Sequence, residues 1–275
     1  MKDSIFSLME EARKSDVMGR PLLEERKVAK VAFIGDTHCA ESVTKEIFKK
    51  YFDGVDLLVF LGDYVDRGKT GVQNLEAILL KLLEYPQKII MLRGNHESPL
   101  ANKDRYLQDN FFDEVAGKFG SDEYQRFNEF FQNLPYAVVV NRYLCVHGGI
   151  ASKLPRVDEI SHLPFPDEMP SNPSAFELLW NDPDPQHGGF SNSQRGPGAF
   201  RYGKDVVEKF LQENNLNGII RAHQVVLDGI KEDFGKVFTV FSSKYHASRF
   251  ESAKAGVLLI RDGKVEKQSF DVFSD

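Results

Sequence analysis

The sequence is poor in cysteine, in long apolar runs and in excess positive charge. It holds only Cys39 and Cys145, which argues against a disulfide framework and favours a reducing cytoplasm, although a bridge between the two stays open. No apolar run reaches the roughly 20 residues of a membrane-spanning helix, and the N-terminal segment shows no signal-peptide core. The net charge of −6 argues against nucleic acid as the partner, because phosphate-backbone binders carry basic surfaces. These absences predict a cytoplasmic protein without nucleic-acid or membrane partners.

The chain has ample material for a hydrophobic core. Its 275 residues are 41% hydrophobic and include 22 phenylalanines, enough for one large α/β domain or two small ones. Apolar runs and helical patterns alternate in the first third of the chain. The apolar runs are Val28–Ile34, Asp56–Leu61 and Lys88–Leu92, and the helical patterns between them are Ser42–Phe52 and Val72–Leu83. Because the runs recur about every 30 residues, this segment is predicted to be a βαβαβ unit.

The remaining pattern completes the expected fold. A helix is predicted over Lys2–Lys14, and Lys103–Leu134 has a helical pattern with regularly placed phenylalanines. After a Pro-rich stretch with one short helix near Ala175–Trp180, strand patterns dominate. The strands predicted in this half are Tyr136–Val140, Tyr143–His147, Gly218–Ala222, Lys236–Phe241 and Gly256–Ile260. We therefore expect an α/β fold of two packed mixed β-sheets flanked by helices, with a helical segment at 1–27 and a single catalytic domain at 28–275.

Polar side chains follow the predicted strands at the points where the strands end. In open α/β sheets, ligands bind outside the carboxyl ends of the strands, so these side chains are expected to converge. Carboxylate, imidazole and amide groups suit hard or borderline metal ions. The residues in question are Asp36, His38, Asp63, Asp66, Asn95, His96, His147 and His223.

The same residue types suit a site for two cations. Two cations about 3.5–4 Å apart need a shared anionic ligand, and they can convert a shared water into hydroxide near neutral pH. Asp63 is the expected bridge, because it lies between the other candidates in sequence. One ion would be held by Asp36, His38 and Asp63, and the other by Asp63, Asn95, His147 and His223.

Four residues fit the binding of a phosphate group and the release of its leaving oxygen. Arg67 and Arg195 are candidate forks for phosphate oxygens, because a guanidinium matches that geometry bidentately. His96 is adjacent to a proposed ligand and is a candidate general acid for the leaving oxygen, with Asp66 orienting its ring. Asp182 and Asp184 are interpreted as residues that structure their loop, and Glu97 as a local hydrogen-bonding group.

Seven short strings in this order resemble the signature of the PPP family of serine/threonine protein phosphatases, within the calcineurin-like metallophosphoesterase superfamily. They are GDTH (35–38), GDYVDRG (62–68), RGNHE (93–97), HGG (147–149), WNDPD (180–184) followed by Arg195-Gly196, RAH (221–223) and FSSKY (241–245). The resemblance implies two packed mixed sheets, a pair of manganese, iron or zinc ions, and in-line attack of a bridging hydroxide on phosphoserine or phosphothreonine. It also implies that Arg67, Asn95 and Arg195 hold the phosphate and that Tyr245 lines the groove.

Some positions depart from that family's pattern. Cys39 stands where the family usually has glycine. His246–Glu251 differs from the family's usual loop after Tyr245, so the substrate specificity of the active-site groove does not follow from the resemblance. The chain resembles a compact, prokaryotic-type member, and the sequence does not identify regulatory subunits. Phosphoproteins or phosphopeptides are the expected substrates. Two alternatives stay open, namely a hydrolase of dinucleoside polyphosphates or other small phosphoesters, and a non-catalytic scaffold that retains the fold.

Overall fold

The parallel unit at the start of the chain builds one of the two large sheets. The computed structural model describes residues 2–243 and 254–271. Strands β2 (Lys30–Ile34), β3 (Leu57–Phe60) and β4 (Ile89–Met91) are parallel neighbours, connected by helices α2 (Glu41–Tyr51) and α3 (Gly71–Glu84). Because these strands are buried, their sequences are almost continuously apolar. The βαβαβ prediction is confirmed, and β13 (Lys254–Arg261) and β14 (Lys264–Asp271) extend the sheet in the order β14-β13-β2-β3-β4.

The second large sheet is also mixed and has six strands in the order β1-β5-β6-β10-β12-β11. Parallel pairs join β1 to β5, β6 to β10 and β10 to β12, whereas β5–β6 and β12–β11 are antiparallel. One core cluster contains buried residues of both sheets, such as Leu58 and Ile220, so the sheets pack against each other. Its strands are β1 (Leu22–Arg26), β5 (Ala137–Val140), β6 (Tyr143–Val146), β10 (Gly218–Arg221), β11 (Ile230–Asp233) and β12 (Val237–Val240).

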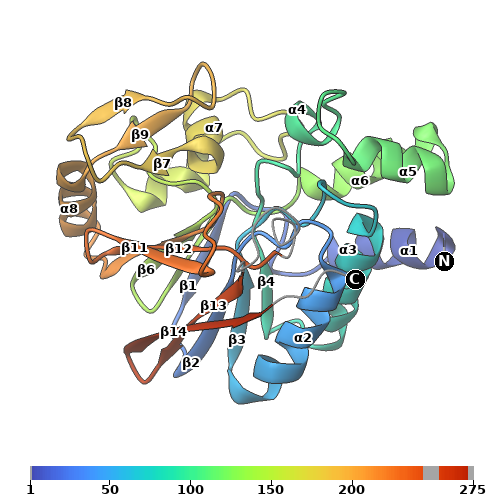
Figure 1. The fold of residues 1–275 in the computed structure, drawn as a ribbon, viewed down its shortest axis with the longest axis horizontal. Helices are drawn as coiled ribbons and strands as arrows, with labels where there is room; N and C mark the ends of the chain where they lie inside the picture. Colours follow the sequence, from blue (N-terminus) through green and yellow to red (C-terminus); the bar gives the residue numbers. More distant parts are fainter. Residues whose placement is uncertain (1, 244–253, 272–275) are drawn as a thin grey trace.

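Helices and a small third sheet surround this sandwich (Figure 1). The helix α1 (Lys2–Ala12) packs near α3, and Phe6 lies with its ring centre 5.4 Å from that of Phe127 in α6. A three-stranded sheet in the order β7-β9-β8 lies with α7 above the sandwich in Figure 1. The remaining elements are α4 (Pro99–Asn102), α5 (Phe111–Phe119), α6 (Tyr124–Phe131), α7 (Pro173–Trp180), α8 (Lys204–Glu213), β7 (Asp182–Pro183), β8 (Phe190–Asn192), β9 (Phe200–Tyr202), and the 3₁₀ helices η1 (Phe52–Gly54), η2 (Ser121–Glu123) and η3 (Val157–His162).

The expected fold class is confirmed, with differences in detail. The N-terminal helix ends at Ala12, earlier than predicted, and residues 22–26 form a strand that the sequence pattern did not reveal. Only one residue of that strand is fully buried, so its apolar signal is weak. Because α1 and β1 both pack into the fold, residues 1–27 are more than a helical extension, and the division at residue 27 stays a prediction.

Among the described helices, none combines the length and the apolar character needed to cross a bilayer.

The hydrophobic core explains why the chain contains so many phenylalanines. Buried rings from α5 and α6, such as Phe111 and Phe127 with centres 5.0 Å apart, pack edge to face and join the two helices. Both rings belong to the core cluster that also contains buried residues of the two large sheets.

Candidate active site

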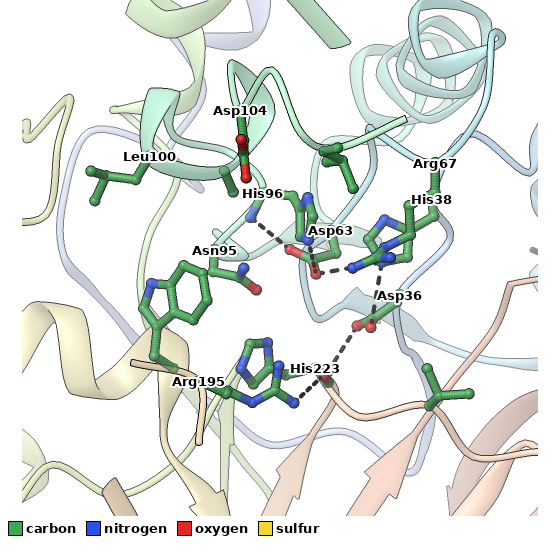
Figure 2. A pocket seen from close by; sticks show the side chains of 14 residues that line it. Asp36, His38, Asp63, Arg67, Asn95, His96, Leu100, Asp104, Arg195 and His223 are labelled. Atoms are coloured by element: carbon green, nitrogen blue, oxygen red, sulfur yellow. Dashed lines mark hydrogen bonds and ion pairs between the residues drawn. The ribbon is translucent and has the colours of Figure 1, made fainter. Parts of the chain in front are cut away.

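The polar residues predicted from the strand ends meet in one place (Figure 2). They line or adjoin a cavity of about 310 Å³ at the carboxyl ends of β2, β3, β4 and β10. His147, which follows β6, is wholly buried beneath the cavity wall, and Asp66 is buried as well. The residues that line the cavity are Asp36, His38, Asp63, Arg67, Asn95, His96, Leu100, Ala101, Asp104, Leu107, Trp180, Arg195, His223 and Val225.

Asp63 stands at the centre of this cluster. Its Oδ1 accepts the backbone N–H of His96 at 2.9 Å, which fixes the carboxylate. Its Oδ2 then faces three imidazoles, at 3.4 Å from His147 Nε2, 3.7 Å from His38 Nε2 and 3.9 Å from His96 Nε2. Asp36 is held in the same manner, because its Oδ1 accepts the N–H of His223 at 2.9 Å while its Oδ2 lies 3.8 Å from His38 Nε2.

The hydrogen bonds fix the tautomers of two histidines. His38 Nδ1 lies 2.8 Å from the carbonyl of Val65, and His147 Nδ1 lies 2.8 Å from the carbonyl of Leu61. A carbonyl can only accept, so each Nδ1 carries the proton and, in the neutral ring, each Nε2 presents a lone pair to the cluster. The partner carbonyls follow the strand β3 or lie in the loop after it, so the same segment that carries Asp63 also orients both rings.

The donor set fits a cation. His147 Nε2 faces Asn95 Oδ1 at 2.9 Å, His223 Nδ1 at 3.2 Å and the Asp63 carboxylate at 3.4 Å, and when these two ring nitrogens are unprotonated all of these atoms offer electron pairs. Such atoms repel one another unless a proton or a metal ion lies among them. Ligand atoms of Asp63, His147 and His223 lie within 4.8 Å of one another, and so do those of His38, Asp63 and His96. The two groups overlap at Asp63, the residue expected to bridge two cations, and the group with His38 contains His96 where the sequence predicted Asp36.

Buried charges perturb the titration of these residues. Burial and the charge of Asp63 raise the pKa of Asp36 to about 6. Burial opposes ionisation of Asp63, but His147 and His96 outweigh it and hold the pKa of Asp63 well below its usual range. Burial and His96 lower the pKa of His38. Two carboxylates within one small buried cluster repel each other, and a cation bound between them would relieve that repulsion.

The backbone around the cluster is strained. Non-glycine residues with positive φ are uncommon, and each costs on the order of 1–3 kcal/mol. Twelve occur in the described part of the chain, and half of them belong to the cluster or its immediate neighbours. These six are His38, Cys39, Asp63, Asp66, Arg67 and His223.

Gly94 and Glu97 hold the loops after β3 and β4 together. A Cβ at Gly94 would overlap the Asp63 carboxylate and backbone, so only glycine permits this close approach. Glu97 is buried and accepts the N–H groups of Asp63 at 2.7 Å, Tyr64 at 2.8 Å and Gly94 at 2.9 Å. Burial and Asp63 raise the pKa of Glu97 to about 7. The interpretation of Glu97 as a merely local hydrogen-bonding group understates its role, because it connects two strand ends.

His96 and Asp66 form a tight pair beside the cluster. His96 Nδ1 lies 2.5 Å from Asp66 Oδ2, and Asp66 Oδ1 accepts the N–H of Phe111 at 2.6 Å. Burial disfavours the protonated ring, but Asp63 and Asp66 outweigh it and raise the pKa of His96 to about 9. The ring also packs edge to face on His38, with centres 4.8 Å apart. Its Nε2 is therefore directed toward the cavity by contacts on two sides.

The two predicted arginines reach the cavity from different loops. Arg67 makes no ion pair or side-chain hydrogen bond with any described residue, so its guanidinium is available. Arg195 donates from Nε to Asp182 Oδ2 at 2.5 Å and from Nη2 to the carbonyl of His223 at 3.0 Å. Asp182 Oδ1 accepts from the buried Arg221 at 2.8 Å, so one carboxylate orients both guanidinium groups. The sequence indicates only a loop-structuring role for Asp182, and its contacts with two arginines could not be predicted from it.

Three further sequence interpretations concern Tyr245, the segment 246–251 and the two cysteines. Tyr245 and the segment 246–251 lie outside the described residues. Cys39 and Cys145 are both buried and free, so the disulfide left open by the sequence does not form. Burial raises the pKa of both thiols, which keeps them in the less reactive protonated form.

Two packed mixed sheets with this cluster at their strand ends define a metallophosphoesterase. Comparison with known proteins agrees, because residues 29–227 match the family described as calcineurin-like phosphoesterase. The chain belongs to this family, which confirms the resemblance seen in the sequence.

Individual relatives are consistent with this assignment. The chain is 37% identical over 243 residues to a protein phosphatase 2A catalytic subunit of Dictyostelium discoideum, and the match covers 86% of this chain and 76% of that relative. A solved protein serine/threonine phosphatase from Saccharomyces cerevisiae, with similarity to human phosphatase PP5, covers 100% of this chain and 91% of its own at 26% identity and a TM-score of 0.87. A cold-active protein-tyrosine phosphatase from Shewanella covers 90% of this chain and 82% of its own at 17% identity and a TM-score of 0.62, which shows a shared fold.

Proposed function

We propose that this chain is a serine/threonine protein phosphatase that hydrolyses phosphoserine and phosphothreonine monoesters in phosphoproteins. Two of the relatives support this substrate class, since they are described as a protein phosphatase 2A catalytic subunit and a protein serine/threonine phosphatase. The observation that carries the chemistry is the convergence of Asn95 Oδ1, His223 Nδ1 and Asp63 Oδ2 on His147 Nε2, at 2.9, 3.2 and 3.4 Å.

The cluster divides into two proposed cation sites. Asp36, His38 and Asp63 would hold one ion, and Asp63, Asn95, His147 and His223 the other. Imidazole, carboxylate and amide ligands suit manganese, iron or zinc, and we favour manganese. When bound, such ions lower the pKa of water and neutralise charge on the phosphoryl group.

The chain's own groups would position the phosphate and handle the leaving group. Arg67 and Arg195 would donate to phosphate oxygens, with the Asn95 amide between them. Asp182 keeps the Arg195 guanidinium in place and so removes part of the entropic cost of binding. His96 Nε2–H would give its proton to the departing serine or threonine oxygen, while the Nδ1 contact with Asp66 fixes the ring.

A cytoplasmic setting is part of this proposal, and it is supported by the two free, buried thiols. The lining role of Tyr245 and the absence of nucleic-acid partners stay predictions.

Hydrolysis of a phosphoserine peptide with and without manganese tests the proposal. Asp63→Asn and His147→Ala should each abolish the metal-dependent activity. Asp63→Asn removes the carboxylate proposed to be shared by both ions, and His147→Ala removes an imidazole that faces this carboxylate. Activity that persists after metal removal would contradict it. A kcat/KM clearly higher for diadenosine tetraphosphate than for the phosphopeptide would favour the dinucleoside polyphosphate hydrolase instead.

A further inference from the structure

The cavity carries an acidic side chain that the proposed chemistry does not use. Asp104 follows α4 and lines the cavity together with Leu100, Ala101 and Leu107. Figure 2 shows its carboxylate directed from the ribbon toward the region of His96. A carboxylate in the same cavity as a phosphate site favours a substrate that carries a positive charge near its phosphate, and disfavours one that carries a further negative charge.

The Asp104 carboxylate has capacity left for a ligand. Its Oδ1 accepts the N–H of Tyr106 at 2.9 Å, which fixes the side chain at the turn. Within residues 2–243 and 254–271 it forms no ion pair, although a cation stands on each side of it in sequence. Lys103 Nζ lies 4.7 Å from the ring centre of Phe112 instead. The Arg105 guanidinium lies 5.0 Å from the ring centre of Tyr106 and donates to its hydroxyl at 3.1 Å.

Apolar side chains of the same segment line the cavity together with Asp104. They are Leu100, which is 43% exposed, Ala101 and Leu107. A lysine or arginine side chain matches this surface, because its methylene stem covers apolar atoms while its charged end reaches a carboxylate. An acidic side chain or a second phosphate would meet Asp104 with like charge.

We propose that Asp104 is a specificity-determining residue that selects phosphopeptides with a lysine or arginine close to the phosphorylated residue. The inference rests on the proposed function. Arg67 and Arg195 provide positive charge for the phosphate, and Asp104 provides negative charge in the same cavity for the neighbouring cation. The cavity is thus complementary to an adjacent pair of opposite charges rather than to phosphate alone.

A peptide panel tests the inference with the manganese-loaded full-length protein. One phosphoserine peptide is made with a single arginine, alanine or glutamate moved through the three positions on either side of the phosphoserine. The readout is the ratio of kcat/KM for the arginine peptide to that for the alanine peptide, which cancels changes in overall activity. At one position or more the ratio should lie between about 2 and 5, within the range expected of a partly exposed ion pair, and it should fall as salt is raised.

Variants then assign the preference. Asp104→Asn should bring the ratio to about 1, because it removes the negative charge. Asp104→Lys should favour the glutamate peptide, because it reverses that charge. Asp122→Asn, which makes the same charge change on the exposed 3₁₀ helix η2, should keep the wild-type ratio. A wild-type ratio near 1 at every position, or an unchanged ratio in Asp104→Asn, would overturn the inference. Failure of the wild-type protein to hydrolyse any peptide would instead remove the proposed function itself.

Discussion

Asp182→Asn tests the carboxylate fork, in which the two oxygens of Asp182 each accept a hydrogen bond from one arginine. The asparagine keeps one side-chain oxygen. One of the two arginines therefore exchanges a charge-assisted hydrogen bond for a hydrogen bond to a neutral oxygen, at a cost of about 1 kcal/mol. The other faces the new NH₂ group instead of an acceptor, which costs about 1–3 kcal/mol in a buried setting. Arg221 is fully buried but keeps the carbonyls of Gly148 and Asn181 as acceptors, at 2.6 and 3.2 Å. The expected loss in the free energy of unfolding is therefore about 3 kcal/mol.

The same change should weaken phosphate binding. Without the Asp182 contact, Arg195 keeps only its bond to the carbonyl of His223, so its guanidinium gains freedom that binding must remove. The inhibition constant of inorganic phosphate should rise about tenfold, in line with a loss of about 1.4 kcal/mol. Urea unfolding followed by fluorescence measures the stability, and inhibition of p-nitrophenyl phosphate hydrolysis measures phosphate binding.

Asp184→Asn is the matched control for this prediction. Asp184 lies two residues further along and is nearly as buried, but its partners are Gln186, His187 and Arg201 rather than the two arginines of the fork. It should cost some stability and leave the phosphate inhibition constant as in the wild type. Equal inhibition constants for wild type, Asp182→Asn and Asp184→Asn would refute the positioning role of Asp182.

Three other predictions address the metal cluster and its support. Gly94→Ala should lower both Tm and bound metal, because the new Cβ overlaps Asp63, whereas Gly117→Ala on the open side of α5 should stabilise the protein by up to about 1 kcal/mol; equal behaviour of the two variants would contradict this reading. His96→Asn should reduce turnover strongly on phosphoserine peptides and far less on p-nitrophenyl phosphate, whose leaving group needs no proton; similar losses on both substrates would argue against a general acid. Chelation should lower the free energy of unfolding by about 2.7 kcal/mol relative to protein at 100 times the metal Kd; a Tm unaffected by chelator would count against a resident metal.

Much of the sandwich could be predicted from local sequence patterns. The strands β2, β3 and β4 are short apolar runs with polar residues directly after them, and this is a property of neighbouring residues alone. Because the carboxyl ends of these parallel strands lie at one edge of the sheet, the proximity of Asp36, Asp63 and Asn95 could be predicted from the sequence. The strand β1 and the sheet of β7, β8 and β9 were missed, because their residues are partly exposed or very few and so leave no clear periodic signal.

The support of the cluster was harder to predict than its members. The contacts of Asp182 join residues 13 and 39 positions away, and Glu97 bridges to a loop 34 residues earlier. Such contacts depend on how loops pack after the sheets have formed, and no spacing in the sequence records them. The strings GDTH, GDYVDRG, RGNHE and HGG each contain a glycine beside a strand end. The positive φ of Asp63 and His223 could not be predicted, because neither residue type requires that conformation.

The left-handed backbone of the cluster has a consequence for engineering this enzyme. Glycine adopts positive φ without steric penalty, so replacing Arg67 or His223 by glycine would release local backbone energy while removing a side chain proposed to act on substrate or metal. A library sorted only for survival at high temperature would tend to collect these replacements. Heat-resistant variants of this protein should therefore be chosen by turnover in the presence of manganese, or the selection will favour inert molecules.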